Sequence, residues 1–141
     1  MTMISYGSGS EADPWILKTP SLGSAFQAWR DEAKAALVVQ VGSTRLSYQW
    51  RCIADLAAML HARGDWVALG NADEGKPVVA GSVEAWARDE SNPVGGYYGL
   101  RNGYRGRFGT YVPPVMEVLG LAEVEHNAKA NRMRVRQQPA T

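Results

Sequence analysis

The sequence contains a single cysteine, Cys52, among its 141 residues. One cysteine permits neither an intramolecular disulfide framework nor a cysteine-based metal cluster. Its neighbours are apolar and recur at helical spacing, where a small buried thiol is common, so we expect Cys52 to pack in the core. No apolar run approaches the roughly 20 residues that cross a bilayer, and the first residues lack the basic start and apolar segment of a signal peptide. We therefore expect a cytoplasmic protein that does not enter the membrane.

Signatures of cofactor binding and catalysis are also missing. Neither GxGxxG nor GxxxxGK[ST] occurs, so a P-loop is excluded, and no GxSxG elbow places a catalytic serine. Metal binding needs several converging ligands, and the chain offers only two histidines, His61 and His126. Adjacent carboxylates such as Asp73 and Glu74 point apart on a helix or strand, so we interpret them as solvated charges. We expect no cofactor, no metal and no catalytic residue.

What the chain does contain is the composition of a globular domain. Hydrophobic residues make up 45% of it and charged residues 21%, which provides enough apolar material for a core. A chain of this length is typical of one domain. The Ser- and Gly-rich opening predicts a flexible leader over residues 1–13, followed by a single domain over residues 14–141.

Hydrophobic spacing and turn residues predict the elements of the first half. Near-helical spacing over residues 24–33, with a serine as N-cap, predicts a helix. Two runs rich in β-branched residues flank the Gly-Ser pair at 42–43, which predicts a β-hairpin. Residues 50–63 predict the clearest helix, with Gly64 as its stop. A short strand is expected over residues 66–69.

The second half predicts two further helices and a terminal hairpin. Residues 82–90 suit a short helix capped by their first serine. Residues 113–119 suit a helix that two prolines begin and Gly120 ends. Alternating runs around residues 126–131 predict the hairpin. We therefore predict an α+β fold: a winged-helix-like three-helix core with a C-terminal β-hairpin, plus an N-terminal extension and β-hairpin.

Six phrases are distributed over most of the chain: DPWILKTP, GDWVALGNADE, GSVEAW, NPVGGYYGL, GRFGTYVPP and LGLAEVEHN followed by NRMR. They resemble those of a small bacterial family known only as a domain of unknown function. The resemblance implies no activity, ligand or catalytic residue. Function therefore has to be inferred from the residues themselves.

The stretch NPVGGYYGLRNGYRGRFGTYVPP, residues 92–114, is the candidate functional segment. Arg101, Arg105 and Arg107 stand in it beside Tyr104 and several glycines. Guanidinium groups match phosphate oxygens, aromatic rings stack on bases, and glycines let a backbone approach a ligand closely. The stretch contains no Asp or Glu, so no carboxylate near in sequence neutralises its arginines. The alternative is a structural connector whose tyrosines cover the core.

The terminal hairpin carries a second set of arginines. Arg132, Arg134 and Arg136 are two residues apart, so in a strand they share one face, which could meet a phosphate backbone. Glu123 and Glu125 on the partner strand share that face in the expected register. Cross-strand ion pairs would then neutralise much of the arginine stripe.

We interpret the chain as a binding domain for nucleic acid or another polyanion, and the candidate site residues are Arg101, Tyr104, Arg105, Arg107, Arg132, Arg134 and Arg136. The first alternative is a protein-interaction module or homodimer that uses exposed tryptophans and the first hairpin. The second alternative is a small-molecule enzyme in which residues 93–112 form a lid over a pocket. The sequence favours binding over catalysis.

Overall fold

The computed structural model describes residues 7–137, which form seven strands and three helices. Four strands make an antiparallel sheet in the order β1-β2-β3-β4, and the other three make an antiparallel sheet in the order β5-β7-β6. The strands of the first sheet are β1 (Trp15–Lys18), β2 (Ala25–Asp31), β3 (Ala36–Val41) and β4 (Thr44–Gln49). Those of the second sheet are β5 (Val67–Ala68), β6 (Ala122–Val124) and β7 (Arg132–Val135).

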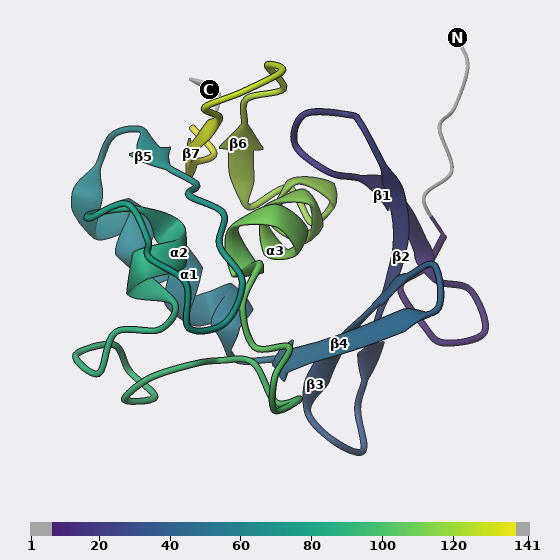
Figure 1. Cartoon of the computed structure of the whole chain (residues 1–141). Helices are drawn as coiled ribbons and strands as arrows, with labels where there is room; N and C mark the ends of the chain where they lie inside the picture. The colour runs from purple at the N-terminus through teal and green to yellow at the C-terminus, as the bar shows by residue number, and fades with distance from the viewer. Residues whose placement is uncertain (1–6, 138–141) are drawn as a thin grey trace, which may run out of the picture.

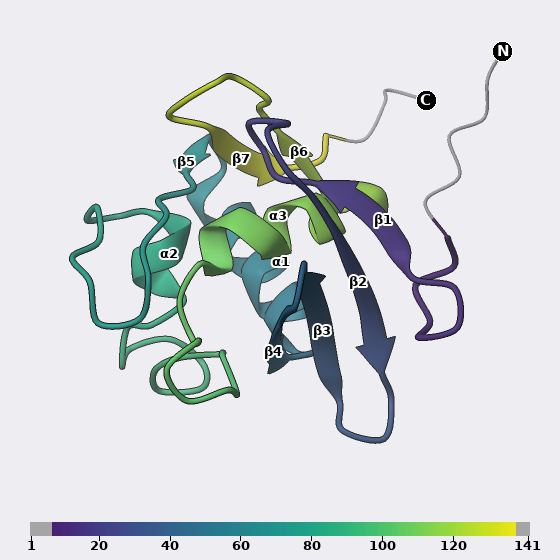
Figure 2. The same cartoon turned by 45° about the vertical axis from the view of Figure 1, so that its right-hand side comes forward.

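The helices are α1 (Cys52–Arg63), α2 (Val83–Trp86) and α3 (Phe108–Val118). Helix α3 lies in the middle of the molecule, with the four-stranded sheet on one side and α1 and α2 on the other (Figure 1 and Figure 2). The small sheet covers one end of this arrangement, where β6 contacts α3 and β7 contacts α1. Both sheets and all three helices contribute side chains to one hydrophobic cluster.

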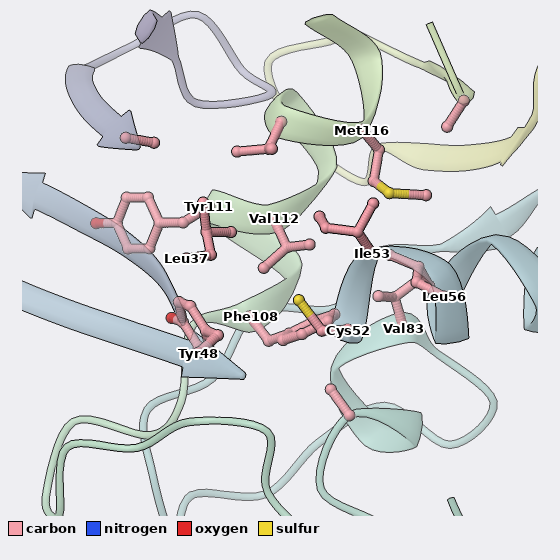
Figure 3. Packing of buried hydrophobic residues seen from close by; sticks show 14 of the residues in the cluster. Leu37, Tyr48, Cys52, Ile53, Leu56, Val83, Phe108, Tyr111, Val112 and Met116 are labelled. Atoms are coloured by element: carbon pink, nitrogen blue, oxygen red, sulfur yellow. The ribbon is translucent and has the colours of Figure 1, made fainter. Parts of the chain in front are cut away.

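The core forms where the inner face of the four-stranded sheet meets α3. Strand β4 buries Leu46 and Tyr48, two residues apart, as the period of a strand requires. The ring of Tyr48 meets that of Phe108 edge to face, with ring centres 5.6 Å apart (Figure 3). Cys52 is fully buried in the same cluster, and burial raises the pKa of its thiol far above the usual range. The prediction that Cys52 packs in the core is confirmed.

The winged-helix prediction is wrong, although the α+β class holds. Helix α2 spans a single turn, and the described residues are arranged around two antiparallel sheets instead of a three-helix core. The segment expected as a helix after Ser24 forms β2, between β1 and β3. Phe26 and Ala28 face the core two residues apart, whereas Trp29 is buried outside that cluster, on the opposite face. Apolar residues on both faces of the strand imitated helical spacing.

Helix α3 begins five residues before the predicted 113–119. Pro113 and Pro114 therefore lie inside the helix and not at its start. A proline inside a helix costs about 3 kcal/mol or more through a lost hydrogen bond and a clash, which is why sequence rules put prolines at helix starts. Here nearly every side chain from Phe108 to Met116 is buried, and this packing compensates for the loss.

Several local predictions are confirmed. Strands β3 and β4 form a hairpin around residues 42–43. Gly64 ends α1 in the left-handed conformation, at φ 70°. The Ser82 side chain accepts the N–H of Ala85 at the start of α2, although that helix ends at Trp86 and not at residue 90. Strands β6 and β7 form the terminal hairpin.

The predicted leader, residues 1–13, falls partly outside the described residues. Its described part forms a turn in which the N–H groups of Ser8 and Gly9 donate to the carbonyl of Asp13, at 3.1 and 3.0 Å. The carbonyl of Gly9 accepts the N–H of Arg30 in β2 at 2.9 Å, which attaches this turn to the sheet.

Candidate functional site

Residues 92–107, which we name the arginine loop, are held by other parts of the chain at several points. Asn92 fixes the first turn. Its side-chain nitrogen donates to the carbonyls of Trp86 and Gly96, at 2.7 and 2.8 Å, and its side-chain oxygen accepts the N–H of Gly95 at 3.0 Å. Because Asn92 is itself buried, this turn is anchored from inside the protein.

The middle of the arginine loop lies along the free edge of β4. The N–H of Gln49 donates to the carbonyl of Tyr98 at 2.9 Å, and the N–H of Leu100 donates to the carbonyl of Ser47 at 2.8 Å. These bonds satisfy the backbone groups of an edge strand as a further strand would. This part of the loop therefore has a structural role, because it covers the edge of the sheet.

Glu74 holds the last part of the arginine loop. Its carboxylate accepts the backbone N–H groups of Gly103 and Arg105, at 3.1 and 2.9 Å. The guanidinium of Arg105 donates to the same carboxylate at 2.7 Å and stacks over the ring of Tyr97. The hydrogen bond from the Arg105 side chain is the main reason that the pKa of Glu74 is lowered to about 2, against the opposing effect of desolvation.

Two glycines of this loop are required by packing within the protein. A side chain at Gly99 would come closer than 3.0 Å to the backbone of Arg105, and one at Gly106 would do the same to the backbone of Glu74. The carbonyl of Gly106 also accepts the hydroxyl of Tyr48 at 2.8 Å. The expectation that glycines leave room for a ligand is wrong at these two positions, because the protein's own backbone occupies the space.

Two arginines of the loop are neutralised by carboxylates that are remote in sequence. Arg105 forms an ion pair with Glu74, and Arg107 donates through Nε to Asp73. The absence of Asp and Glu within the loop therefore does not leave these arginines unpaired. The fold brings the arginines to these carboxylates. The backbone N–H of Arg107 donates to the carbonyl of Ala72 at 2.8 Å, which places the end of the arginine loop beside the segment that carries Asp73 and Glu74.

Arg101 and Tyr104 form an exposed pair at the edge of the loop. The guanidinium of Arg101 donates to the carbonyl of Arg45 at 2.7 Å and lies 4.1 Å from the centre of the Tyr104 ring. Among residues 7–137, no carboxylate lies within ion-pair distance of Arg101. Arg101 thus keeps an unneutralised charge.

Two of the three arginines of the terminal hairpin are paired across the strands as the sequence indicated. Arg132 donates to Glu125 at 2.8 Å, and Arg134 pairs with Glu123 across the strands. Both guanidinium groups also stack over the ring of Trp66, at 5.2 and 4.3 Å from its centre. These two arginines therefore consolidate the small sheet.

The arginine loop and the terminal hairpin do not share one surface. Figure 1 and Figure 2, which differ by a turn about the vertical axis, both place the β6–β7 hairpin at the top and the arginine loop at the bottom. Arg136 directly follows β7 and belongs to the hairpin end. The described structure thus divides the seven candidate residues between two opposite ends.

A pocket of about 480 Å³ opens beside the arginine loop, between that loop, the β3–β4 hairpin and the start of α3. Its lining includes the apolar Val41 and Leu46, the aromatic Tyr104 and Tyr111, and the charged Asp73 and Arg107. Two of the seven candidate residues, Tyr104 and Arg107, come together here. Arg101 and Arg105 are neighbours in the loop but do not line the pocket.

Two polar groups in this pocket lack protein partners. The Tyr111 residue is only 8% exposed and its side chain points away from α3 toward the sheet (Figure 3); its hydroxyl is open to solvent and has no hydrogen-bond partner among residues 7–137. Arg107 is 44% exposed and uses only Nε for Asp73, so within residues 7–137 its two outer nitrogens meet no acceptor. A hydroxyl and guanidinium nitrogens without protein partners are available to hydrogen-bond a polar ligand in this pocket.

Arg107 has an unusual backbone conformation, with φ at 58° in the left-handed region. It immediately precedes α3, and the buried carboxylate of Glu84 accepts the N–H groups of Phe108 and Gly109 at 3.2 and 2.9 Å. Glu84 is in turn paired with Arg88 at 2.9 Å. The start of α3, and with it the backbone of Arg107, is held from within the core.

Sequence reasoning missed Tyr111 and Asp73. A tyrosine among apolar residues suggests core packing, and Asp73 belongs to a carboxylate pair that we interpreted as solvated. No local signal could have joined them to Arg107, because the contact between Asp73 and Arg107 connects residues 34 positions apart. Only the folded backbone places these groups around one pocket.

The described residues form a small α+β fold with a pocket beside the arginine loop. The chain belongs to the Family of unknown function (DUF6855), whose sequence profile matches residues 7–136. No curated protein and no solved structure matches the chain. No helix among residues 7–137 is both long enough and apolar enough to cross a membrane.

Proposed function

We propose that this protein is a non-catalytic binding domain that holds a compact ligand with an anionic group in the pocket beside the arginine loop. The observation that carries the proposal is that one pocket is lined by both Arg107 and Tyr111. The outer nitrogens of Arg107 and the hydroxyl of Tyr111 have no hydrogen-bond partner among the described residues. A guanidinium offers pairs of donors in a plane, which match the oxygens of a carboxylate or phosphate. Of the seven residues expected to bind an anion, only Arg107 and Tyr104 belong to the proposed site.

The size and lining of the pocket support a small ligand. Ligand sites usually have volumes of about 300–1,000 Å³ and an apolar lining with a few placed polar groups. This pocket has about 480 Å³, an apolar side formed by Val41 and Leu46, and a Tyr104 ring that is 45% exposed. An apolar or aromatic body in contact with these residues would place its anionic group on Arg107.

Preorganisation supports the same proposal. A non-glycine residue in the left-handed conformation costs about 1–2 kcal/mol, and such residues cluster at functional sites. Arg107 keeps this conformation between the Asp73 ion pair and the Glu84 cap at the start of α3. A guanidinium that starts from a fixed backbone loses less conformational freedom when it binds a ligand.

Binding of an extended polyanion is supported less well and stays a prediction. Arg105, Arg132 and Arg134 already have carboxylate partners, and the loop and hairpin lie at opposite ends. The protein-interaction alternative relied on exposed tryptophans, yet none of the five belongs to the exposed large hydrophobic residues. Bacterial origin and cytoplasmic location also stay predictions.

The test is an NMR titration of the whole chain with benzoate and, separately, with phenyl phosphate. We expect either probe to shift the amide resonances of Gly103, Tyr104 and Tyr111, which line the pocket. The probe that binds more tightly shows whether the site prefers a carboxylate or a phosphate. Arg107→Gln should weaken binding about tenfold or more, because a charge-assisted hydrogen bond contributes about 1.5–3 kcal/mol. Arg136→Gln removes the same charge at the other end and should leave binding unchanged.

A short single-stranded oligonucleotide is the competing probe. Binding of a polyanion through arginines weakens steeply as salt increases. If the oligonucleotide binds in this way while neither small anion shifts the pocket resonances, the pocket proposal is wrong and the extended surface is right. If the small anions bind equally well to Arg107→Gln, the assignment of Arg107 is wrong.

A further inference from the structure

The pocket carries an acidic group as well as a basic one. Asp73 and Glu74 both line it, but Glu74 is occupied by Arg105 and by two backbone N–H groups. Asp73 is 58% exposed, and its only partner among the described side chains is Nε of Arg107, which it meets through Oδ1. Its second oxygen, Oδ2, has no protein donor among residues 7–137, and the Nε contact keeps the Asp73 carboxylate next to the Arg107 guanidinium.

We infer that the ligand of this pocket is a zwitterion, a free α-amino acid with an apolar or aromatic side chain. The inference rests on the proposed function and adds a second charged contact to it. The carboxylate of the amino acid lies on the outer nitrogens of Arg107, and its ammonium donates to Oδ2 of Asp73. The side chain extends over Val41, Leu46 and Tyr111, which form the apolar part of the lining.

Charge complementarity favours a zwitterion over a ligand with one charge. A simple anion on Arg107 would bring its oxygens close to the carboxylate of Asp73, and like charges at close range repel. A simple cation on Asp73 would face the guanidinium of Arg107 in the same way. An α-amino acid carries its two opposite charges on neighbouring carbon positions, so it complements an adjacent carboxylate and guanidinium together.

The residues that line the pocket also indicate which kind of side chain the bound amino acid carries. The Tyr104 ring forms an exposed aromatic wall, and Arg101, which stacks on that ring, does not line the pocket. An aromatic or branched apolar side chain can pack against this ring and the apolar residues. The hydroxyl of Tyr111 is available as a further donor or acceptor for the ligand.

The inference excludes ligands that lack one of the two charges. A peptide bound by its N-terminus has the ammonium without the α-carboxylate, and one bound by its C-terminus has the carboxylate without the α-ammonium. Either would satisfy only one member of the Asp73–Arg107 pair. A free amino acid is the smallest ligand that satisfies both.

The experiment compares phenylalanine with two analogues that keep its phenylethyl skeleton but lack one charged group, on the wild-type chain. One is 3-phenylpropanoate, which lacks the ammonium, and the other is phenethylamine, which lacks the carboxylate. We expect phenylalanine to shift the pocket amides and to bind about tenfold or more tightly than either analogue, since each charged contact contributes at least a factor of this order. This comparison needs no variant, so it holds even where a substitution disturbs folding.

Variants assign the second contact. Asp73→Asn keeps the shape of the side chain but removes both the partner of the ammonium and the repulsion of the anion. It should weaken the binding of phenylalanine, strengthen that of 3-phenylpropanoate, and so abolish the preference for phenylalanine. Glu32→Gln removes an exposed carboxylate elsewhere and is the matched control. Its affinity for phenylalanine should equal that of the wild type.

The outcomes separate the inference from the proposed function. If 3-phenylpropanoate binds as tightly as phenylalanine and Asp73→Asn changes neither, the zwitterion is wrong and the anion pocket stands. If phenylalanine and both analogues fail to shift the pocket amides while benzoate or phenyl phosphate does, the inference is again wrong and the proposed function stands. If no probe of either series shifts these amides, both are wrong.

Discussion

Glu84, with 1% of its surface exposed, accepts the backbone N–H of Gly109 at 2.9 Å and so ties α2 to the start of α3. The same carboxylate accepts the N–H of Phe108 and pairs with Arg88. Burial raises the pKa of Glu84, and the N–H of Gly109 and the guanidinium of Arg88 limit that rise. Since α3 crosses the core and begins beside the pocket, this one side chain links the stability of the domain to the geometry of Arg107.

Replacing this carboxylate should destabilise the fold strongly. Glu84→Gln keeps the size of the side chain but leaves the largely buried Arg88 without its counter-ion. Removing one member of a buried ion pair costs about 3–5 kcal/mol, and the remaining amide oxygen recovers part of that, so we expect a loss of about 2–4 kcal/mol. Urea denaturation measures it.

The control for this variant is Glu90→Gln, which removes an exposed carboxylate four residues after the short helix α2. Exposed substitutions of this kind usually change stability by less than about 0.5 kcal/mol. Equal stabilities of the two variants would mean that Glu84 does not hold α3. The explanation that Glu84 fixes the backbone of Arg107 would then be wrong.

Local signals were enough for those elements whose residues interact with near neighbours. The β3–β4 hairpin, the end of α1 at Gly64 and the cross-strand pairs of Arg132 and Arg134 all depend on residues within one helix or one hairpin. Alternation, a left-handed glycine and strand register each have a sequence signature. These parts of the fold could be predicted, and they are confirmed.

The candidate site could not be predicted in the same way. Arg105 and Arg107 appeared unpaired, because their partners Glu74 and Asp73 lie on a segment more than thirty positions earlier. Strand β2 resembled a helix because Trp29 is buried on the face opposite the core. Both errors have one physical cause. Tertiary contacts decide which charges pair and which side chains are buried, and the local sequence pattern does not show these contacts.

The carboxylate of Glu74 should keep the arginine loop in place down to strongly acidic pH. Its folded pKa of about 2 lies below the ordinary 4.5, so its stabilising effect is present above pH 4.5 and is lost as the pH falls from there through about 2. Amide hydrogen exchange at Gly103 and Arg105, both of which donate to Glu74, measures this effect. We expect protection that declines only at the acidic end of this window.

Glu74→Gln removes the charge and should raise exchange at these two amides at every pH above 4.5. The amide of Gln49, which the loop covers through Tyr98, serves as an internal control and should remain protected. Unchanged exchange at Gly103 and Arg105 in the variant would show that the loop keeps its path without Glu74.

His126 should contribute a pH-dependent contact between three segments. Its Nδ1 lies 2.9 Å from the carbonyl of Pro20, and its Nε2 lies 2.7 Å from Glu117 at the end of α3. Both neighbours are acceptors, so the arrangement is best satisfied when both ring nitrogens carry protons. Desolvation lowers the pKa of His126, but the hydrogen bonds to Glu117 and Pro20 outweigh it, and the net pKa is raised above 6.5.

The sign of the effect follows from this raised pKa. The contact contributes its full stability below pH 6.5 and loses it as the pH rises through the folded pKa. Because His126 is partly exposed, the contribution should be at most about 1 kcal/mol. Thermal melts of wild type and His126→Gln should differ most at low pH and converge at high pH, whereas His61→Gln should show no such trend. A difference that grows with pH would contradict this assignment.

Arg107→Gly should separate stability from binding. Glycine adopts φ 58° without the steric penalty of about 1–2 kcal/mol that arginine bears there, and the lost surface ion pair with Asp73 is worth about 0–1 kcal/mol. Glycine also makes the unfolded chain more flexible, so we expect the free energy of unfolding to stay within about 1 kcal/mol of the wild type. Binding of the small anions and of phenylalanine should nevertheless be lost, because the guanidinium is gone. Urea denaturation together with the NMR titrations tests both halves, and a large loss of stability would show that Arg107 is retained for the fold and not for a ligand.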